Sequence, residues 1–163
     1  MLGGLLFTGC GKQNESEVET ENSLKEKFSN AEIRTDIEPV ANRITWLTVK
    51  ECQWKAVSFE SSVPGPTDIL VCGYITTDDR FFEEASAAYE WYCPHFSINM
   101  IPEGIKEESL NFMVSEEYRE MYEEKQNGSK VGIYVDFDNR LVYFSGTFSG
   151  IKDNQDVKQL QEP

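Results

Sequence analysis

Alternation of apolar and polar residues is clearest near the C-terminal end of the chain. The odd-numbered positions there are apolar, namely Val131, Ile133, Val135 and Phe137. Asp138-Asn139 then supplies a turn sequence, and residues 141–148 form a second largely apolar run. Two runs of this kind on either side of a turn are typical of a β-hairpin. The pattern therefore predicts a hairpin over residues 131–148.

Other apolar runs favour further strands. Residues 69–76 alternate with apolar side chains on both faces, which is typical of a strand in the centre of a sheet. Shorter runs rich in β-branched and aromatic residues occupy residues 44–49, 54–59, 96–101 and 110–114. Residues 61–66 carry two prolines and a glycine, so they are predicted to be a loop.

Two helices are predicted from helical spacing and end signals. Apolar side chains recur at helical spacing over residues 81–92, after the potential cap Asp78-Asp79 and before Pro94. Ser115 is a favourable N-cap for a second helix, and Glu116-Glu117 suit the positive end of its dipole. Asn127-Gly128 then provides a C-terminal stop signal.

The order of these elements indicates a β-rich α+β fold. From residue 69 onward, once the excursion around the first helix is set aside, three strands, a helix and two strands remain. This order resembles the OB-fold, a five-stranded Greek-key barrel. The resemblance implies an OB-fold-like barrel, to which residues 44–59 would add an N-terminal hairpin. The alternative is an antiparallel sheet with the helices packed on one face.

The domain organisation follows from composition along the chain. Residues 10–40 are dominated by Glu, Ser, Asn, Thr and Lys, and we expect an acidic, disordered linker there. A short helix around residues 24–33 would be marginal alone. Residues 41–150 are expected to form a single globular β-rich domain, and residues 151–163 a frayed polar tail.

Charge limits the partners. The 163 residues include 29 acidic and 15 basic side chains, and the net charge is -14. Because phosphate backbones are bound through Lys and Arg, nucleic acid is not expected as a partner. No apolar run of about 18 residues follows Cys10, so no membrane-spanning helix is expected.

The N-terminal residues Leu5-Leu6-Phe7-Thr8-Gly9-Cys10 combine an apolar run, two small residues and a cysteine. This pattern resembles the lipobox of bacterial lipoprotein signal peptides. The resemblance implies cleavage before Cys10 and lipidation of Cys10, with residues 1–9 as a remnant of the signal peptide. The protein would then be extracytoplasmic and anchored to a bacterial membrane by its N-terminal lipid.

Candidate chemistry in the domain is sparse. His95 is the only histidine and lies two residues from Cys93, but no C-x-x-C or second histidine supplies further zinc ligands. No nucleophile-elbow, P-loop or zincin motif occurs, so we expect neither an enzyme nor a metal or other cofactor. Asp136, Asp138 and Asn139 are predicted to form a turn rather than a calcium loop. The three interior cysteines, Cys52, Cys72 and Cys93, allow one disulfide whose pairing stays open.

The function predicted from these features is a surface-tethered lipoprotein with a small β-rich domain that binds a protein, a peptide or a small ligand. Some of Tyr134, Tyr143 and Phe144 are expected on an exposed recognition face. In a barrel, residues 96–101 and 110–114 would carry the ligand, although no ligand-binding residue is assigned. One alternative is a structural envelope-maintenance lipoprotein without a ligand site, and another is a metal or thiol protein that uses Cys93 and His95.

Overall fold

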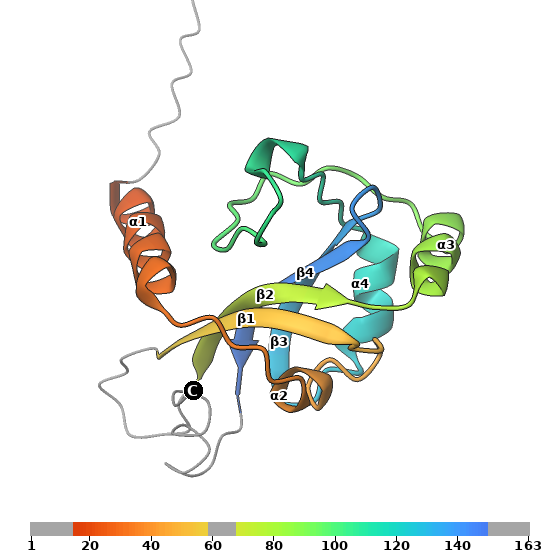
Figure 1. The fold of residues 1–163 in the computed structure, drawn as a ribbon, viewed down its shortest axis with the longest axis horizontal. Helices are drawn as coiled ribbons and strands as arrows, with labels where there is room; N and C mark the ends of the chain where they lie inside the picture. Colours follow the sequence, from red (N-terminus) through yellow and green to blue (C-terminus); the bar gives the residue numbers. More distant parts are fainter. Residues whose placement is uncertain (1–14, 59–67, 150–163) are drawn as a thin grey trace, which may run out of the picture.

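The computed structural model describes residues 15–58 and 68–149, with side chains described from residue 22 onward (Figure 1). The helices are α1 (Glu15–Asn30), α2 (Glu38–Ala41), α3 (Asp79–Ala88), the short 3₁₀-helix η1 (Glu107–Ser109) and α4 (Glu116–Glu123). The strands are β1 (Glu51–Ser58), β2 (Ile69–Thr76), β3 (Ser129–Asp136) and β4 (Leu141–Phe148). None of the described helices combines the length and the apolar character that crossing a bilayer requires.

The four strands form one open antiparallel sheet in the order β1-β2-β4-β3. The predicted C-terminal hairpin is confirmed, since β3 pairs directly with β4 and Val135 lies opposite Val142. Arg140 completes its turn in the left-handed region, with φ of 53°. The central position predicted for residues 69–76 is also confirmed, because β2 lies between β1 and β4.

One face of the sheet packs against α2, α3 and α4. Its core contains Trp54 of β1 and Phe144 of β4 together with Phe82 of α3 and Tyr118 of α4. The two helices predicted from sequence thus lie on the same face, as the alternative prediction of an antiparallel sheet required. The predicted N-cap of α4 is confirmed, since Ser115 Oγ accepts a hydrogen bond from Tyr118 N at 3.3 Å.

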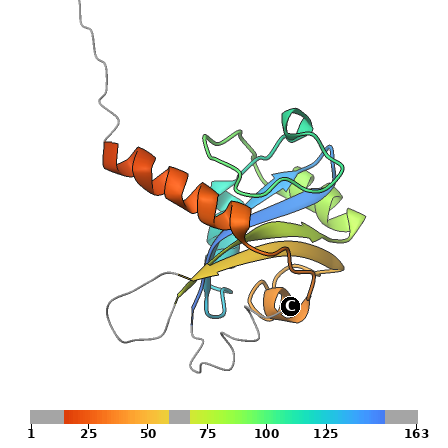
Figure 2. The ribbon, with the colours of Figure 1, turned by 60° about the vertical axis from the view of Figure 1, so that its left-hand side comes forward.

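The opposite face is covered by α1 and by the long segment between α3 and α4 (Figure 2). Tyr74 and Tyr143 of the sheet pack there against Phe28 of α1 and against Met100 and Phe112 of that segment. The domain therefore has three layers, with the sheet in the middle.

The closed barrel is not observed, because the described strands form an open sheet. Residues 96–101, predicted as a strand, are irregular and lie over the sheet. Tyrosine hydroxyls hold them: Tyr74 Oη donates to Met100 O, and Tyr143 Oη accepts from Asn99 N at 3.3 Å. Residues 110–114 form only isolated bridges, one of which pairs Met113 with Val135.

The predicted N-terminal hairpin is also absent from the described structure. Residues 44–49 turn instead of forming a strand, because Ile44 and Leu47 are buried together in the core of the helical face. The adjacent residues form β1, which pairs with β2 along its whole length.

The prediction of a disordered linker is wrong for the described part of residues 10–40. That part contains α1, most of α2, and the buried side chains Phe28 and Val40. Lys55 Nζ donates to Phe28 O at 2.8 Å, which places a cation at the C-terminal end of α1. The folded unit therefore begins before residue 41. Residues 10–14, like the predicted signal remnant and the predicted C-terminal tail, lie outside the described residues.

Side chains of α4 and of the segment that follows it protect the free edge of β3. The Gln126 amide accepts from Val131 N at 2.8 Å and donates to Val131 O at 3.3 Å. Tyr122 Oη accepts from Ile133 N at 3.2 Å. The backbone of Val135, the next residue whose N–H and C=O point to this edge, pairs with the backbone of Met113. Unpaired strand edges promote pairing with strands of other chains. These hydrogen bonds occupy backbone groups at the edge of β3 and therefore disfavour such pairing.

Candidate functional site

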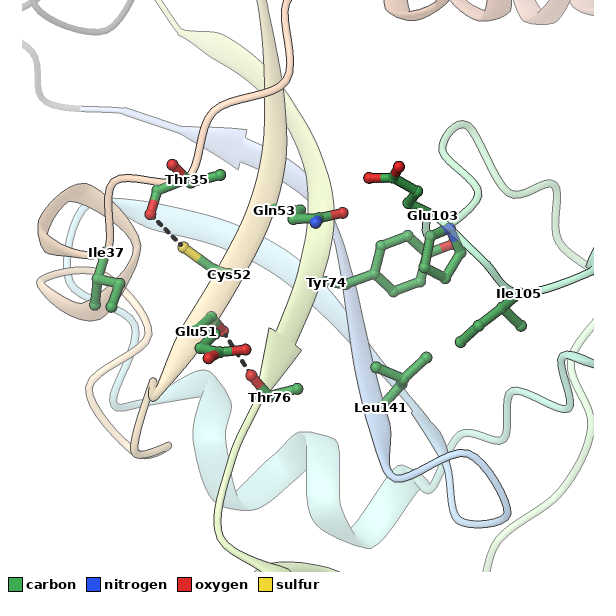
Figure 3. A pocket seen from close by; sticks show the side chains of 11 residues that line it. Thr35, Ile37, Glu51, Cys52, Gln53, Tyr74, Thr76, Glu103, Ile105 and Leu141 are labelled. Carbon is green, nitrogen blue, oxygen red and sulfur yellow. Dashed lines mark hydrogen bonds between the residues drawn. The ribbon is translucent and has the colours of Figure 1, made fainter.

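A cleft of about 380 Å³ lies where β1 begins and β2 ends (Figure 3). Three separate parts of the chain form it. Residues 35–37 supply one wall, residues 102–105 supply the other, and the strand ends 51–53 and 74–76 lie between them. The first residue of β4, Leu141, completes the lining. A volume of this order suits a small molecule.

Apolar side chains make up much of the lining. They are Ile37, Tyr74, Pro102, Ile105 and Leu141. Ile37 is 37% exposed, so it leaves apolar surface available in the cleft.

Polar contacts fix the first wall to β1. The backbones of Arg34 and Trp54 exchange two hydrogen bonds, from Arg34 N to Trp54 O at 2.7 Å and from Trp54 N to Arg34 O at 2.9 Å. Asp36 O then accepts hydrogen bonds from Trp54 Nε1 at 3.0 Å and from the Cys52 thiol at 3.4 Å. The Arg34 guanidinium pairs with the Asp36 carboxylate at 2.7 Å and lowers the pKa of that carboxyl. The backbone that carries Thr35 and Ile37 is therefore held in place before any ligand arrives.

The second wall is held by the tyrosine hydroxyls of the sheet. Met100 is 5% exposed, and its carbonyl accepts from Tyr74 Oη just before Pro102 enters the cleft. Burial is the largest cause of the raised pKa of Tyr74, so its hydroxyl remains a neutral donor at physiological pH. Because this hydroxyl is engaged with Met100, the ring of Tyr74 is the part that lines the cleft.

The charged side chains of the lining are both acidic. Figure 3 shows Glu51 on the β1 side of the cleft and Glu103 on the loop side. The remaining polar lining consists of uncharged groups, including Gln53 and Thr76, whose hydroxyl donates to Glu51 O at 3.3 Å. Among the lining residues no Lys or Arg balances the two carboxylates.

The cysteines do not gather into a site. Cys52 belongs to the core of the helical face and Cys72 to the core of the opposite face, whereas Cys93 is exposed. All three thiols are free. Burial raises the pKa of Cys52 to about 11 and that of Cys72 to about 12, so both thiols stay protonated near neutral pH. Cys10 lies outside the described residues.

The Cys93–His95 pair lies exposed in the segment after α3, where Cys93 Sγ contacts Asn111 Oδ1 at 3.7 Å. Neither buried cysteine accompanies it at the surface. Within the described residues, His, Cys, Asp and Glu side chains form no group of three or more able to hold a metal ion. The metal or thiol alternative requires Cys52 or Cys72 beside Cys93 and His95, and the fold instead buries these two cysteines in the two cores.

The expected recognition face is also corrected. Tyr143 and Phe144 are fully buried, and Tyr134 stacks on Phe96 with ring centroids 4.1 Å apart. Residues 96–101 and 110–114, expected to carry ligand in a barrel, instead pack over Tyr134 and Tyr143 as part of the core of that face, whereas Phe144 lies in the core of the helical face. The predicted turn at Asp136 is confirmed, since its carboxylate accepts from Asn139 N at 2.9 Å.

Sequence reasoning missed the residues of the cleft. Glu51, Glu103 and Ile105 carry no motif and lie far apart in the chain. Ile37 is one weak signal, because it is an aliphatic residue within the polar stretch predicted to be a linker.

Comparisons of this chain with protein-family models, with curated proteins and with solved structures find no match. Function is therefore inferred from the cleft and from the N-terminal sequence.

Proposed function

We propose that this protein is a lipoprotein tethered to a membrane surface, whose small β-rich domain binds a ligand in the cleft between residues 35–37 and 102–105. The observation that carries the proposal is the cleft itself. It has about 380 Å³ of space, partly exposed apolar walls, and a few polar groups at its margins. Binding sites for small molecules combine these features.

The construction of the walls supports binding. Asp36 O is fixed by Trp54, and Met100 O is fixed by Tyr74, so each wall is attached to the sheet by a side chain of a neighbouring strand. A cleft whose walls are already ordered loses less conformational entropy when a ligand binds.

The resemblance of residues 5–10 to a lipobox supports the membrane tether. Only four residues separate Cys10 from Glu15, where α1 begins. The N-terminal end of α1 points away from the sheet (Figure 2). Its 16 residues correspond to a rise of roughly 24 Å, so α1 can act as a spacer between lipid and domain.

Lipidation is tested by mass spectrometry of the protein produced in a bacterial host. The expected product is a mature chain that starts at Cys10 and carries the mass of attached acyl groups. A Cys10→Ser chain should lack that mass and should leave the membrane fraction. Recovery of the unmodified chain with Met1 intact, in a host that processes other lipoproteins, would refute the tether.

Binding in the cleft is tested by a fragment screen observed through backbone amide NMR signals of the Cys10→Ser chain. Fragments that bind are expected to shift the signals of Gln53, Thr76 and Gly104. A Gln53→Trp variant places a large ring in the cleft and should weaken these fragments at least about tenfold, which is about 1.4 kcal/mol.

Glu120→Trp is the matched control, because it adds the same ring at an exposed position of α4, on the other face of the sheet. It should leave the fragment affinities unchanged. If no fragment shifts the cleft signals, or if Gln53→Trp has no effect, the binding proposal is wrong. A structural lipoprotein without a ligand site would then be favoured.

A further inference from the structure

The charges that line the cleft point to a class of ligand. We infer that the cleft selects a small organic cation, an ammonium group carried on an apolar body. This inference rests on the proposal that the cleft binds a ligand, and it adds the chemistry of that ligand.

Two carboxylates are available for a cation. Glu51 and Glu103 are exposed, and neither takes part in the ion pairs found among the described residues. Lys50 precedes Glu51 but is paired with Asp78 at 2.5 Å, outside the cleft. Lys106 follows Ile105 but does not line the cleft. A bound ammonium group would therefore meet carboxylates that no lining cation already neutralises.

The apolar walls favour a cation with a hydrocarbon body over a fully hydrated one. Ile37 and Ile105 lie on opposite walls and keep part of their surface exposed to solvent. Covering this surface with an alkyl group gains hydrophobic free energy. The ring of Tyr74 between the walls is an additional favourable neighbour for a cation, because its π face is electron-rich.

Other ligand classes fit less well. An anion would be opposed by both carboxylates and by the net charge of -14. A divalent metal ion requires several oxygen ligands, yet within the described part of the chain no group of three or more candidate ligands exists. A neutral apolar molecule could pack against the apolar walls but would form no ionic interaction with the carboxylates.

The test compares three probes of equal chain length that differ in charge: hexylammonium, hexanol and hexanoate. Each is titrated into the Cys10→Ser chain while the backbone signals of Gln53, Thr76 and Gly104 are followed. Hexylammonium is expected to bind at least about tenfold more tightly than hexanol, and hexanoate more weakly than both. Raising the salt concentration should weaken hexylammonium and leave hexanol unchanged, since salt screens exposed charges.

Matched double variants separate local charge from net charge. Glu51→Gln with Glu103→Gln should reduce the affinity for hexylammonium about tenfold, to that for hexanol. Glu83→Gln with Glu120→Gln changes the net charge equally at exposed positions of α3 and α4, and should have little effect. All four positions are exposed, so both double variants are expected to fold.

The outcomes distinguish this inference from the proposed function. If hexanol binds in the cleft as tightly as hexylammonium, or if both double variants reduce binding equally, the cation inference is overturned while binding in the cleft stands. If neither these probes nor any fragment shifts the cleft signals, both are overturned. Nα-acetyl-lysine methylamide, which carries a lysine side chain between two peptide groups, is the last probe. If it binds tenfold more tightly than hexylammonium, the ligand is a lysine of a peptide, and the choice of a free small molecule is overturned.

Discussion

Replacing Gly146 with alanine is expected to lower the free energy of unfolding by about 3 kcal/mol. A Cβ atom added at this position would lie 2.1 Å from Lys130 O and 2.8 Å from Val131 Cα. Both contacts are with the backbone of β3, so they are relieved only if β4 moves away from its partner strand. Urea denaturation measures the loss, and the midpoint of thermal unfolding should fall by roughly 10 °C.

Gly132→Ala is the matched control because it lies in the same hairpin, opposite Ser145. The three atoms nearest to its added Cβ all belong to the side chain of Tyr134, at 3.3–3.5 Å. A side chain can shift by a few tenths of an ångström where a paired backbone cannot, so the expected loss is below about 1 kcal/mol. Equal losses from the two substitutions would show that strand separation at Gly146 is not the cause.

Two of the elements predicted correctly from sequence, the β3–β4 hairpin and the start of α4, are determined by short-range interactions. The β3–β4 hairpin needs only two alternating runs and a turn between them, and all its pairing is local. The start of α4 depends on Ser115 and on a backbone N–H three residues later. In both cases the residues that specify the element are also the residues that contact one another, so the sequence pattern was sufficient.

The elements predicted wrongly depend on distant residues. Residues 96–101 have the composition of a strand, but the groups that bind their backbone are the hydroxyls of Tyr74 and Tyr143. The segment before residue 41 is polar enough to suggest disorder, yet Phe28 and Val40 bury their side chains in two different cores. No local pattern reveals that a single aromatic residue in an acidic stretch will find a partner in the sheet.

The candidate site was hidden for the same reason. Ile37 and Ile105 lie 68 positions apart in the sequence and face one cleft only because β1 and β2 are paired between them. The excess of 14 negative charges makes acidic side chains common on any surface of this chain. The sequence could not predict which of the many Glu residues would line an apolar space.

Removing the Asp136 carboxylate is the second substitution with a large expected effect. This carboxylate is fully buried and accepts three hydrogen bonds: from Asn111 N at 2.9 Å, from Asn139 N at 2.9 Å and from Asn139 Nδ2 at 2.8 Å. Asp136→Ala leaves two backbone N–H groups without their acceptor. We expect the free energy of unfolding to fall by about 3 kcal/mol, since part-buried donors that lose a fully buried carboxylate acceptor are costly.

Two further variants identify the cause of that loss. Asp136→Asn keeps one acceptor oxygen and should recover part of the stability, whereas Asp138→Ala removes an exposed carboxylate from the same turn and should cost less than about 0.5 kcal/mol. Backbone amide exchange supplies a local readout, because Asn111 belongs to the segment that covers the sheet and Asn139 belongs to the hairpin turn. Faster exchange at both positions in Asp136→Ala shows that this one carboxylate joins them. Unchanged exchange at Asn111 would contradict that role and would leave the phenol hydroxyls of Tyr74 and Tyr143 as the main attachments of the segment.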